Sequence, residues 1–393
     1  MYKIKTFNAI SQRGLERFSN SLFDVNDNVV GESAILLRSH KLEMASIAST
    51  VRAVARAGAG VNNVPVNECT NQGIVVFNTP GANANAVKEL VVCALLLASR
   101  GIVQGIDFVR SQTQIQDYAE LAKIMEKEKK QFKGSEISGK TLGVIGLGAI
   151  GSMVAKIAID LGMDVLGYDP ALSVEAAWRL PSEVKHISSL STLMAKSDFV
   201  TLHLPVLDST RGLINSDMFD AMKPGACLIN FARDEIVDTD ALVQALKSDV
   251  MDKYISDFPR PELMANKKVI TMPHLGASTR EAEENCAVMA ADQLKDFLEN
   301  GNIKNSVNFP NLSLEREVNS LANTRLAISN KNVPKMLGQI LSVLADQNIN
   351  VLDMMNKSRG EIAYNLIDLE REPSDKAIAA INSIADVIQV TLL

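Results

Sequence analysis

Three polar residues that could act together on a hydroxyl group each follow a candidate β-strand: Arg233, Glu262 and His274. Histidine suits the role of general acid/base because imidazole titrates near physiological pH, and a carboxylate can orient it and stabilise its protonated form. An arginine can grip a carboxylate through a forked, charge-assisted pair of hydrogen bonds. Together these side chains suit removal of a proton from a secondary alcohol beside a carboxylate. Taken alone, however, His274 is more often an ordinary loop histidine and Glu262 a surface acid, so a second signal must support them.

That second signal is the glycine-rich segment 143–151, which reads Gly-Val-Ile-Gly-Leu-Gly-Ala-Ile-Gly and continues an apolar, strand-like run. Gly146 permits a tight turn, Gly148 lets the backbone approach a phosphate, and Gly151 lets a helix pack on the strand. The free N–H groups of the helix N-terminus then face the phosphates of a dinucleotide. The residues predicted to face the pyrophosphate are Gly146, Gly148, Ala149, Ile150 and Gly151.

A second strand-like run ends in Asp169, about 20 residues beyond the glycine turn. A carboxylate at this place can accept hydrogen bonds from a ribose 2′-hydroxyl, whereas it would repel the 2′-phosphate of NADP. Asp169 therefore favours NAD as the cofactor. With a nicotinamide beside them, the three candidate catalytic residues suit the oxidation of a secondary alcohol by hydride transfer.

Length and composition limit the class of protein. At 393 residues, with 47% hydrophobic and 22% charged residues, the chain is long for one core and predicts two or three domains. Its formal net charge of −6 argues against a nucleic-acid partner. The four cysteines are far apart, which favours reduced core residues over disulfides or metal ligands, and no metal site is expected. The apolar run 90–98 is too short to span a bilayer, so we expect a cytoplasmic protein without membrane contact.

The elements that must position these residues follow from the pattern along the chain. The first hundred residues alternate apolar strands with helical segments and predict an α/β unit of their own. From 141 to about 279, strands and helices alternate in the doubly wound manner. A long helical pattern follows at 279–300, and the polar segment after it is typical of a linker. Residues 324–393 then give the order strand, helix, strand, strand, helix, strand, a βαββαβ module of the ferredoxin-like type.

The segments around the three candidate catalytic residues resemble the signatures of the D-2-hydroxyacid dehydrogenases. They are residues 230–233, 257–262 and 273–279, and the resemblance covers nearly the whole chain. Two departures from the family pattern remove no chemical group. Asp234 stands where a glycine commonly follows the arginine, and Leu263 stands where a proline often follows the glutamate.

By that resemblance, the chain would be an α/β protein with a Rossmann-like, doubly wound NAD domain inserted in a flavodoxin-like substrate domain. Residues 1–100 and 280–301 would form the substrate domain, and residues 101–279 would form the NAD domain. A linker at 302–323 would lead to a βαββαβ, ferredoxin-like regulatory domain of the ACT type at 324–393. Catalysis would take place in a cleft whose closure excludes water.

The resemblance implies NAD-dependent oxidation of D-3-phosphoglycerate to 3-phosphohydroxypyruvate, the first step of L-serine synthesis. Hydride would pass from C2 to the nicotinamide while His274 accepts the hydroxyl proton. One alternative is the same chemistry on an unphosphorylated acid such as glycerate, glyoxylate or lactate. A less favoured alternative is an NAD(H)-sensing binding protein similar to the corepressors of this family. The presence of Arg233, Glu262 and His274 together speaks against that alternative.

The resemblance also implies roles for residues outside the catalytic three. The backbone N–H groups of Ala59 and Gly60 would face the substrate carboxylate, and Arg38 or Arg56 would supply the charge that a phosphate needs. For each arginine, a structural surface cation is an equally good interpretation. The residues that would lie against the cofactor are His203, Pro205, Phe231, Ala232, Asp257, Gly276 and Ala277.

The tail resembles domains through which serine inhibits some members of the family. Asn332 and Asn350 match residues expected to contact such an amino acid. Lys335 departs from that pattern because a glycine usually follows Pro334, and a lysine side chain in this loop could fill the effector pocket. Feedback by L-serine is therefore set against a purely assembly-forming module. The family pattern suggests a homodimer through the NAD domains, or a homotetramer through the tails.

Overall fold

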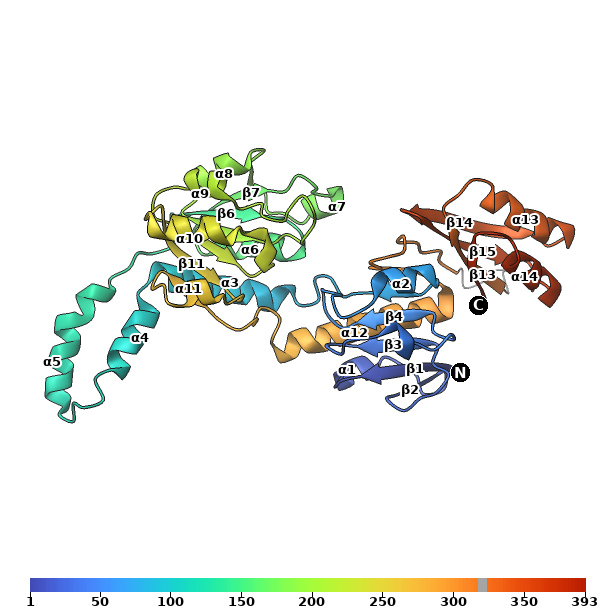
Figure 1. The fold of residues 1–393 in the computed structure, drawn as a ribbon, viewed down its shortest axis with the longest axis horizontal. Coiled ribbons are helices and arrows are strands. Elements are labelled where there is room, and N and C mark those ends of the chain that lie inside the picture. Colours follow the sequence, from blue (N-terminus) through green and yellow to red (C-terminus); the bar gives the residue numbers. More distant parts are fainter. Residues whose placement is uncertain (317–323) are drawn as a thin grey trace. The chain divides into compact units, whose positions relative to one another are not determined.

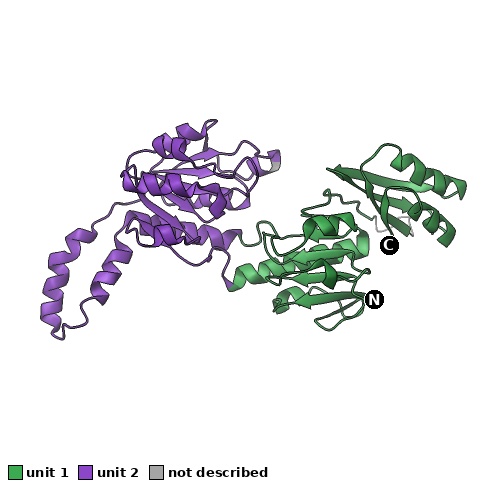
Figure 2. Ribbon diagram, in the orientation of Figure 1, with its two compact units in different colours: residues 1–83, 280–393 green, residues 84–279 purple. Residues whose placement is uncertain are grey.

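The computed structural model describes residues 1–316 and 324–393 (Figure 1). Contacts between residues divide the chain into two compact units, which Figure 2 colours separately. The first, which we call the discontinuous unit, contains residues 1–83 and 280–393. The second, which we call the inserted unit, contains residues 84–279. Two segments far apart in the sequence therefore form one body, and the chain between them forms the other.

The domain boundaries expected from the sequence differ in places from the division seen in the structure. Residues 317–323, the last part of the linker expected at 302–323, lie outside the described residues. The helix at 84–99 belongs to the inserted unit, whereas the sequence places a domain boundary at residue 100. The finer domain boundaries stay a prediction. Within the described part of the chain, no helix is both long enough and apolar enough to cross a membrane.

The discontinuous unit contains a five-stranded sheet in which all neighbouring strands run parallel. Its strands are β1 (Tyr2–Phe7), β2 (Phe23–Asn26), β3 (Ala34–Leu37), β4 (Ala53–Arg56) and β5 (Val75–Phe77). Their order is β2-β1-β3-β4-β5, the order of flavodoxin-like folds. All residues of β3 are buried, because a parallel sheet is covered on both faces and its central strands are continuous apolar runs.

A helix from the far end of the unit's sequence completes the core around this sheet. This helix, α12 (Arg280–Asn300), contacts β3, β4 and α1 (Gln12–Leu15). A Cβ added to Gly14 of α1 would lie 2.6 Å from the Cβ of Ala287, so the two helices meet where neither carries a large side chain. The short helices α2 (Val66–Asn71) and η1 (Met44–Ser46) complete the α/β part. Residues buried on α12 recur at helical spacing and include Ala282, Cys286, Ala290, Ala291, Leu294 and Phe297.

The inserted unit is built on a seven-stranded parallel sheet. Its strands are β6 (Thr141–Ile145), β7 (Asp164–Tyr168), β8 (Lys185–His186), β9 (Phe199–Leu202), β10 (Ala226–Asn230), β11 (Met251–Ser256) and β12 (Val269–Thr271). The order β12-β11-β10-β9-β6-β7-β8 runs from β6 outward to β8 and restarts at β9 on the other side of β6. The carboxyl ends of β6 and β9 therefore mark the switch point at which doubly wound sheets bind ligands.

Helices cover this sheet and begin at capped ends. The helices α3 (Ala84–Ser99) and α6 (Ala149–Asp160) pack against each other and share one apolar core with the sheet. The shorter helices are α7 (Val174–Ala177), α8 (Leu190–Lys196), α9 (Ser216–Asp220), η3 (Asp234–Ile236), α10 (Thr239–Lys247) and α11 (Pro261–Met264). Four of the shorter helices described in this unit, α7, α8, α9 and α10, start at a side chain that accepts a hydrogen bond from a backbone N–H of the first turn, which compensates an otherwise unsatisfied donor.

A helical arm extends from the inserted unit. It comprises α4 (Ile102–Arg110), α5 (Tyr118–Glu128) and η2 (Lys129–Phe132), and Figure 1 shows α4 and α5 beside each other. Apolar side chains of α4 remain uncovered: Ile106 is 46% exposed and Val109 is 53% exposed. The arm therefore presents an apolar surface that its own unit does not bury.

The tail, residues 324–393, folds as the expected βαββαβ module. Its elements are β13 (Thr324–Lys331), α13 (Met336–Asp346), β14 (Val351–Arg359), β15 (Ile362–Leu369), α14 (Asp375–Asn382) and β16 (Val387–Leu392). The strands form an antiparallel sheet in the order β14-β15-β13-β16. One face packs on α13 and α14 through residues such as Ile328 and Ile367. The opposite face, with Tyr364 and Leu366, shares a core with the parallel sheet of the discontinuous unit.

A buried arginine fixes the start of the tail. The Arg325 side chain is fully buried, and its Nε and Nη2 donate to the two carboxylate oxygens of Asp368 at 2.5 and 2.8 Å. Its Nη1 donates to the backbone carbonyls of Asn300, at the end of α12, and Leu314. One guanidinium thus joins two strands of the tail to the segment that precedes the tail.

The four cysteines are all free thiols. Cys93, on α3, is exposed, and the other three are buried. Burial raises the pKa of Cys69 to about 11 and that of Cys227 to about 12, and it also raises the pKa of Cys286. The buried thiols therefore stay protonated and unreactive at neutral pH.

We expect Arg325→Met to lower the free energy of unfolding by about 3–5 kcal/mol, because it leaves the Asp368 carboxylate buried without a partner. The double variant Arg325→Met/Asp368→Leu should regain much of that loss, because no uncompensated charge remains. Arg13→Met breaks an exposed ion pair to Glu284 and serves as the control that should change little. Chemical denaturation measures all three. Equal effects of Arg325→Met and Arg13→Met would contradict the anchoring role.

Candidate active site

The glycine turn after β6 has the geometry of a phosphate cradle. Gly146 has a φ of +91°, and a Cβ there would lie 2.6 Å from the carbonyl oxygen of His203. A Cβ on Gly151 would lie 1.9 Å from the carbonyl oxygen of Gly146, so only glycine lets α6 start this close to the turn. Gly148 caps α6, is exposed, and has no atom within 4 Å of an added Cβ. The N-terminus of α6 therefore opens to a ligand, as a pyrophosphate requires.

Asp169 lies directly beside this turn. It follows β7, and its carboxylate oxygens accept hydrogen bonds from the backbone N–H groups of Leu147 at 2.9 Å and Ala171 at 3.0 Å. These bonds hold the carboxylate at the end of the second strand, half-buried. A carboxylate so placed can accept hydrogen bonds from a ribose hydroxyl.

Arg233 lies in a loop that its own neighbours fix. Asn230, the last residue of β10, accepts from the Ala232 N–H and donates from Nδ2 to the Arg233 carbonyl at 2.9 Å. The next residue, Asp234, binds Arg260 after β11 through both carboxylate oxygens, with Nε distances of 3.0 and 2.9 Å. This ion pair joins the loops after two adjacent strands. Asp234, the departure from the family pattern, thus has a structural partner that the sequence did not indicate.

Glu262 and His274 follow the next two strands of the same edge. Glu262 lies in the first turn of α11 and His274 follows β12, and both are exposed. The His274 ring lies 5.0 Å from the Phe258 ring, centroid to centroid. No described hydrogen bond joins the two side chains, and their expected roles stay a prediction. Such catalytic bonds are often long without substrate and tighten when it binds.

Asp257 is the buried acid of this edge, only 1% exposed. Its Oδ2 accepts from the backbone N–H of Gly276 at 2.9 Å, which fixes the loop that carries Gly276 and Ala277. Its Oδ1 has no hydrogen-bond partner among the described residues. Because a buried carboxylate oxygen without a donor is costly, this atom marks a place for a donor from a ligand. An amide such as the carboxamide of a nicotinamide would fit it.

His203, at the switch point, is held neutral. Its Nε2 lies 3.0 Å from the Thr201 hydroxyl, and burial lowers its pKa to about 3. The nearby Pro205 is exposed, whereas Phe231 and Ala232 are buried beneath the Arg233 loop. The structure therefore gathers the expected cofactor residues of the inserted unit along one edge of its sheet. In the described part of the chain, no group of histidine, cysteine and acidic residues is placed to hold a metal ion.

The expected substrate residues lie in the discontinuous unit. Arg38 follows β3, and its Nη2 binds the Glu283 carboxylate of α12 at 2.5 Å. Arg56 ends β4, and its Nε donates to the Arg38 carbonyl at 3.1 Å. The loop after β4 carries Ala59 and Gly60, both half-buried, and Asn78 donates to the Ala59 carbonyl at 2.6 Å. Glu283 was missed from the sequence, because nothing local connects it to an arginine so far away in the chain.

The same surface contains a cavity of about 170 Å³ whose lining includes Ser11, Arg38, Ala57 and Glu283. Both a cation and an acid therefore face it. This pairing leaves Arg38 partly neutralised, in contrast to the free cation expected for a phosphate. The Arg56 side chain folds over its own loop, since a Cβ on Gly58 would lie 1.9 Å from Arg56 Nη1.

The expected effector residues lie in loops at the edge of the tail. Asn332 is exposed, and its Nδ2 donates to the Gly360 carbonyl at 3.1 Å. Asn350 is exposed before β14. Lys335, which precedes α13, has a φ of +74°. This left-handed conformation favours glycine, which explains physically why a glycine is expected after Pro334.

Comparisons with known proteins place these features in a family. Residues 92–277 match the model of the NAD-binding domain of the D-isomer-specific 2-hydroxyacid dehydrogenases. The D-3-phosphoglycerate dehydrogenase of Haemophilus influenzae is 34% identical over 89% of this chain and 83% of its own length. The NAD⁺-bound 3-phosphoglycerate dehydrogenase of Entamoeba histolytica has 25% sequence identity and a TM-score of 0.61, over 78% of this chain and 98% of that one.

Other relatives are longer than this chain. The D-3-phosphoglycerate dehydrogenase of Methanocaldococcus jannaschii is 34% identical over 82% of this chain but only 58% of its own length. That of Archaeoglobus fulgidus is 36% identical over 71% of this chain and 52% of its own length. The chain thus spans little more than half the length of these two curated relatives.

The neutral state of His203 predicts a pH dependence of stability. Its pKa is about 3 in the folded chain against 6.5 for an ordinary histidine, so below pH 6.5 the unfolded chain binds a proton that the folded chain does not. The free energy of unfolding should therefore fall as the pH falls, by about 1.5 kcal/mol between pH 6.5 and pH 5. Subtracting the curve of His203→Gln isolates this contribution, and the exposed His186→Gln is the matched control. Identical pH curves for all three chains would refute the assignment.

Proposed function

The chain belongs to the D-isomer-specific 2-hydroxyacid dehydrogenase family, and from that premise we propose that it catalyses the NAD-dependent oxidation of D-3-phosphoglycerate to 3-phosphohydroxypyruvate. This reaction is the first step of L-serine biosynthesis. The observation that carries the proposal is the similarity to the Haemophilus influenzae D-3-phosphoglycerate dehydrogenase over most of both chains. The presence of Arg233, Glu262 and His274 on loops after neighbouring strands supports it.

The proposed roles follow from the chemistry of an α-hydroxy acid. Bound NAD would supply the acceptor for the hydride that leaves C2. His274 takes the hydroxyl proton at the same time, so that the C–H and O–H bonds become a C=O bond without charge left on the substrate. Arg233 grips the substrate carboxylate through a forked pair of hydrogen bonds. Glu262 orients His274 and stabilises its protonated form once the substrate draws the two loops together.

Cofactor binding is assigned to the sheet edge of the inserted unit. The turn at Gly146, Gly148 and Gly151 would hold the pyrophosphate, and Asp169 would accept hydrogen bonds from the ribose. The unpaired Oδ1 of Asp257 would accept a hydrogen bond from the nicotinamide carboxamide. The open N-terminus of α6 and the Asp257 Oδ1 lack a described partner, and the Asp169 carboxylate can accept further hydrogen bonds. NAD supplies all of the partners.

Phosphate recognition is assigned to Arg38 and Arg56, and the carboxylate to the backbone N–H groups of Ala59 and Gly60. Arg38 directly follows β3 and Arg56 ends the adjacent strand β4, and the Arg56 side chain donates to the Arg38 backbone carbonyl. The ion pair of Arg38 with Glu283 favours a second candidate function, the same oxidation of an unphosphorylated acid, because the acid already neutralises one of the two cations.

The tail is proposed to be an ACT-type regulatory module with L-serine as its effector. The βαββαβ order and the exposed loops with Asn332 and Asn350 support this assignment. Lys335 lies between Asn332 and the start of α13, where its side chain would compete for the space of an effector.

The assembly is proposed to be a homodimer formed through the helical arm. The partly exposed Ile102, Ile106 and Val109 of α4 support this, since a second copy of the arm would cover them. A homotetramer through the tails is the larger form. Sedimentation equilibrium of the intact chain decides the point, and a monomer at micromolar concentration would count against both. The cytoplasmic location inferred from composition stays a prediction.

The decisive experiment follows NADH oxidation by the purified protein with 3-phosphohydroxypyruvate and, in parallel, hydroxypyruvate, glyoxylate, pyruvate and 2-oxoglutarate. We expect kcat/KM to be highest for the phosphorylated acid. Arg38→Ala and Arg56→Ala should each lower its kcat/KM by about 10- to 100-fold, the value of a charge-assisted hydrogen bond, and change that for hydroxypyruvate little. His274→Gln should lower turnover of every substrate by about 10²- to 10⁴-fold.

Arg13→Ala is the matched control for the two phosphate variants. Like Arg38, Arg13 pairs with a glutamate of α12, at 2.8 Å from Glu284. Its loss should leave the substrate preference unchanged. Equal or better turnover of an unphosphorylated acid would move the protein to the second candidate function. No turnover of any acid would revive the NAD(H)-sensing binding protein.

The effector assignment predicts that L-serine lowers the rate and that Lys335→Gly strengthens this inhibition by clearing the loop. The same substitution should raise the free energy of unfolding by about 1 kcal/mol, because it relieves a left-handed backbone conformation. Lys376→Gly, within α14, is the control, since a glycine in a helix should lower stability instead. Inhibition curves and denaturation measure the two effects. A rate unaffected by serine in both the wild type and Lys335→Gly would leave the tail as an assembly module.

A further inference from the structure

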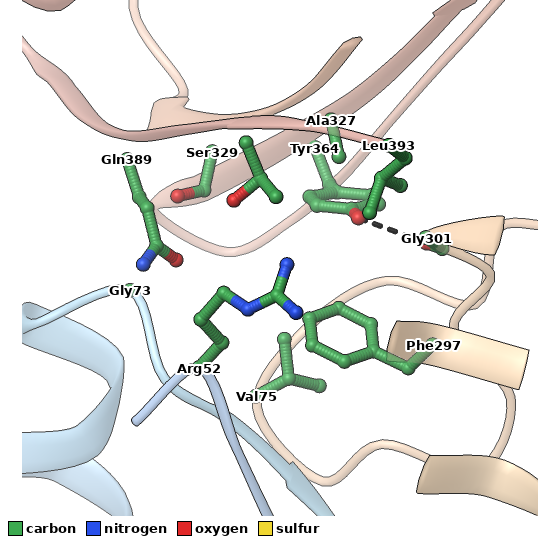
Figure 3. A pocket seen from close by; sticks show the side chains of 11 residues that line it. Arg52, Gly73, Val75, Phe297, Gly301, Ala327, Ser329, Tyr364, Gln389 and Leu393 are labelled. Carbon is green, nitrogen blue, oxygen red and sulfur yellow. Dashed lines mark hydrogen bonds between the residues drawn. The ribbon is translucent and has the colours of Figure 1, made fainter. Parts of the chain in front are cut away.

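The tail sheet and the parallel sheet of the discontinuous unit enclose a small polar cavity (Figure 3). Arg52, the residue before β4, points its guanidinium into the space below the tail strands. Ser329 of β13 and Gln389 of β16 border the space from the tail. The cavity has a volume of about 10 Å³, close to what one water molecule needs. The cavity therefore has room for a single small molecule or ion.

The contact around this cavity is close. Gly73, after α2, has a φ of +75°, and a Cβ there would lie 3.0 Å from Ile388 Cγ2 and 3.2 Å from Ser329 Oγ. Tyr364 of β15 donates its hydroxyl to the Gly301 carbonyl at 2.8 Å, so it is already satisfied. The cavity is thus a defined gap in a packed interface within one unit.

The charge in this gap is positive. No acidic side chain is among the described residues that line the cavity, and no described ion pair includes Arg52. The guanidinium carbon of Arg52 lies 5.6 Å from the centre of the Tyr2 ring, and burial lowers the Arg52 pKa. A cation that is partly withdrawn from water in this way is stabilised by an anion nearby. The side chains that interact with the Arg52 guanidinium are those of Tyr2, which shares a hydrogen bond with it, and Tyr364, and both are uncharged.

An unused donor faces the same space. Ser329 is 3% exposed, and its hydroxyl has no hydrogen-bond partner among the described residues. Elsewhere in the tail, buried polar side chains such as Arg325 and Asn365 have partners. A buried hydroxyl without a partner is costly, so Ser329 marks a place for an acceptor. Thr391 and Gln389 contribute further polar groups to the lining.

We propose that this cavity binds one small monatomic anion of the size of chloride, held by the Arg52 guanidinium and the Ser329 hydroxyl. The anion neutralises the half-buried cation and accepts the hydrogen bond that Ser329 leaves unused. Because Arg52 belongs to the parallel sheet and Ser329 to the tail, the bound anion joins the two parts of the discontinuous unit. Oxyanions such as phosphate or acetate are too large for the space. The site does not depend on the function proposed above.

The test is thermal unfolding of the full chain as chloride replaces gluconate at constant ionic strength, which keeps charge screening unchanged. We expect a saturable rise in Tm. At a chloride concentration ten times the Kd, the unfolding equilibrium constant should fall about 11-fold. Arg52→Met and Ser329→Ala should each abolish this response. Arg371→Met, which removes an exposed arginine of the tail, is the matched control and should retain it.

Ser329→Ala keeps the test decisive even if Arg52→Met fails to fold, because it removes only a hydroxyl. Crystals grown in bromide should show an anomalous peak beside Arg52 and Ser329. A Tm independent of chloride would overturn the proposal, and a bromide peak without chloride-dependent stability would mean an adventitious ion only. Greater stabilisation by phosphate or acetate, lost in the same variants, would overturn the monatomic assignment.

Discussion

The candidate site depends on one close approach, that of helix α6 to the turn that precedes it. A single Cβ on Gly151 would meet the Gly146 carbonyl at 1.9 Å and push the helix off its strand. Since the turn also meets the backbone of His203, after β9, the same constraint fixes the two strand ends at the switch point. Asp169 then binds the N–H of Leu147 within the turn. Cofactor geometry in this fold is therefore set by backbone clearance before any side chain takes part.

In the discontinuous unit, buried polar groups, rather than close backbone contacts, position the tail. The buried Arg325 donates to Asp368 and to two backbone carbonyls. At the start of the tail, the charge of this arginine is therefore neutralised by Asp368 and its donors have partners. In the same interface, the Ser329 hydroxyl has no described partner and lies beside the half-buried Arg52. The stability of an interface that contains polar groups without partners can depend on the ions in solution. The stability of an apolar interface of the same area would depend on them much less.

The sequence predicted what is encoded locally. The glycine turn, the alternation of strands and helices, and the βαββαβ tail follow from patterns within a few residues, and the structure contains them. Contacts between residues far apart in the sequence could not be predicted in this way. Glu283 binds Arg38 from far along the chain, and Asp234 binds Arg260 across two loops. That Asp257 Oδ1 has no described partner likewise depends on how distant parts of the chain fold around it. The roles of the site residues stay predictions, because they concern a ligand rather than the chain.

The distribution of thiols makes the chain convenient for solution studies. Cys93 is the exposed cysteine on α3, while the other three are buried and resist ionisation. Because the thiolate is the reacting species, a maleimide dye should attach at one place in the inserted unit without prior removal of native cysteines. A second cysteine introduced on the surface of the discontinuous unit would complete a donor–acceptor pair. Energy transfer between the dyes would then follow any change in their separation in real time.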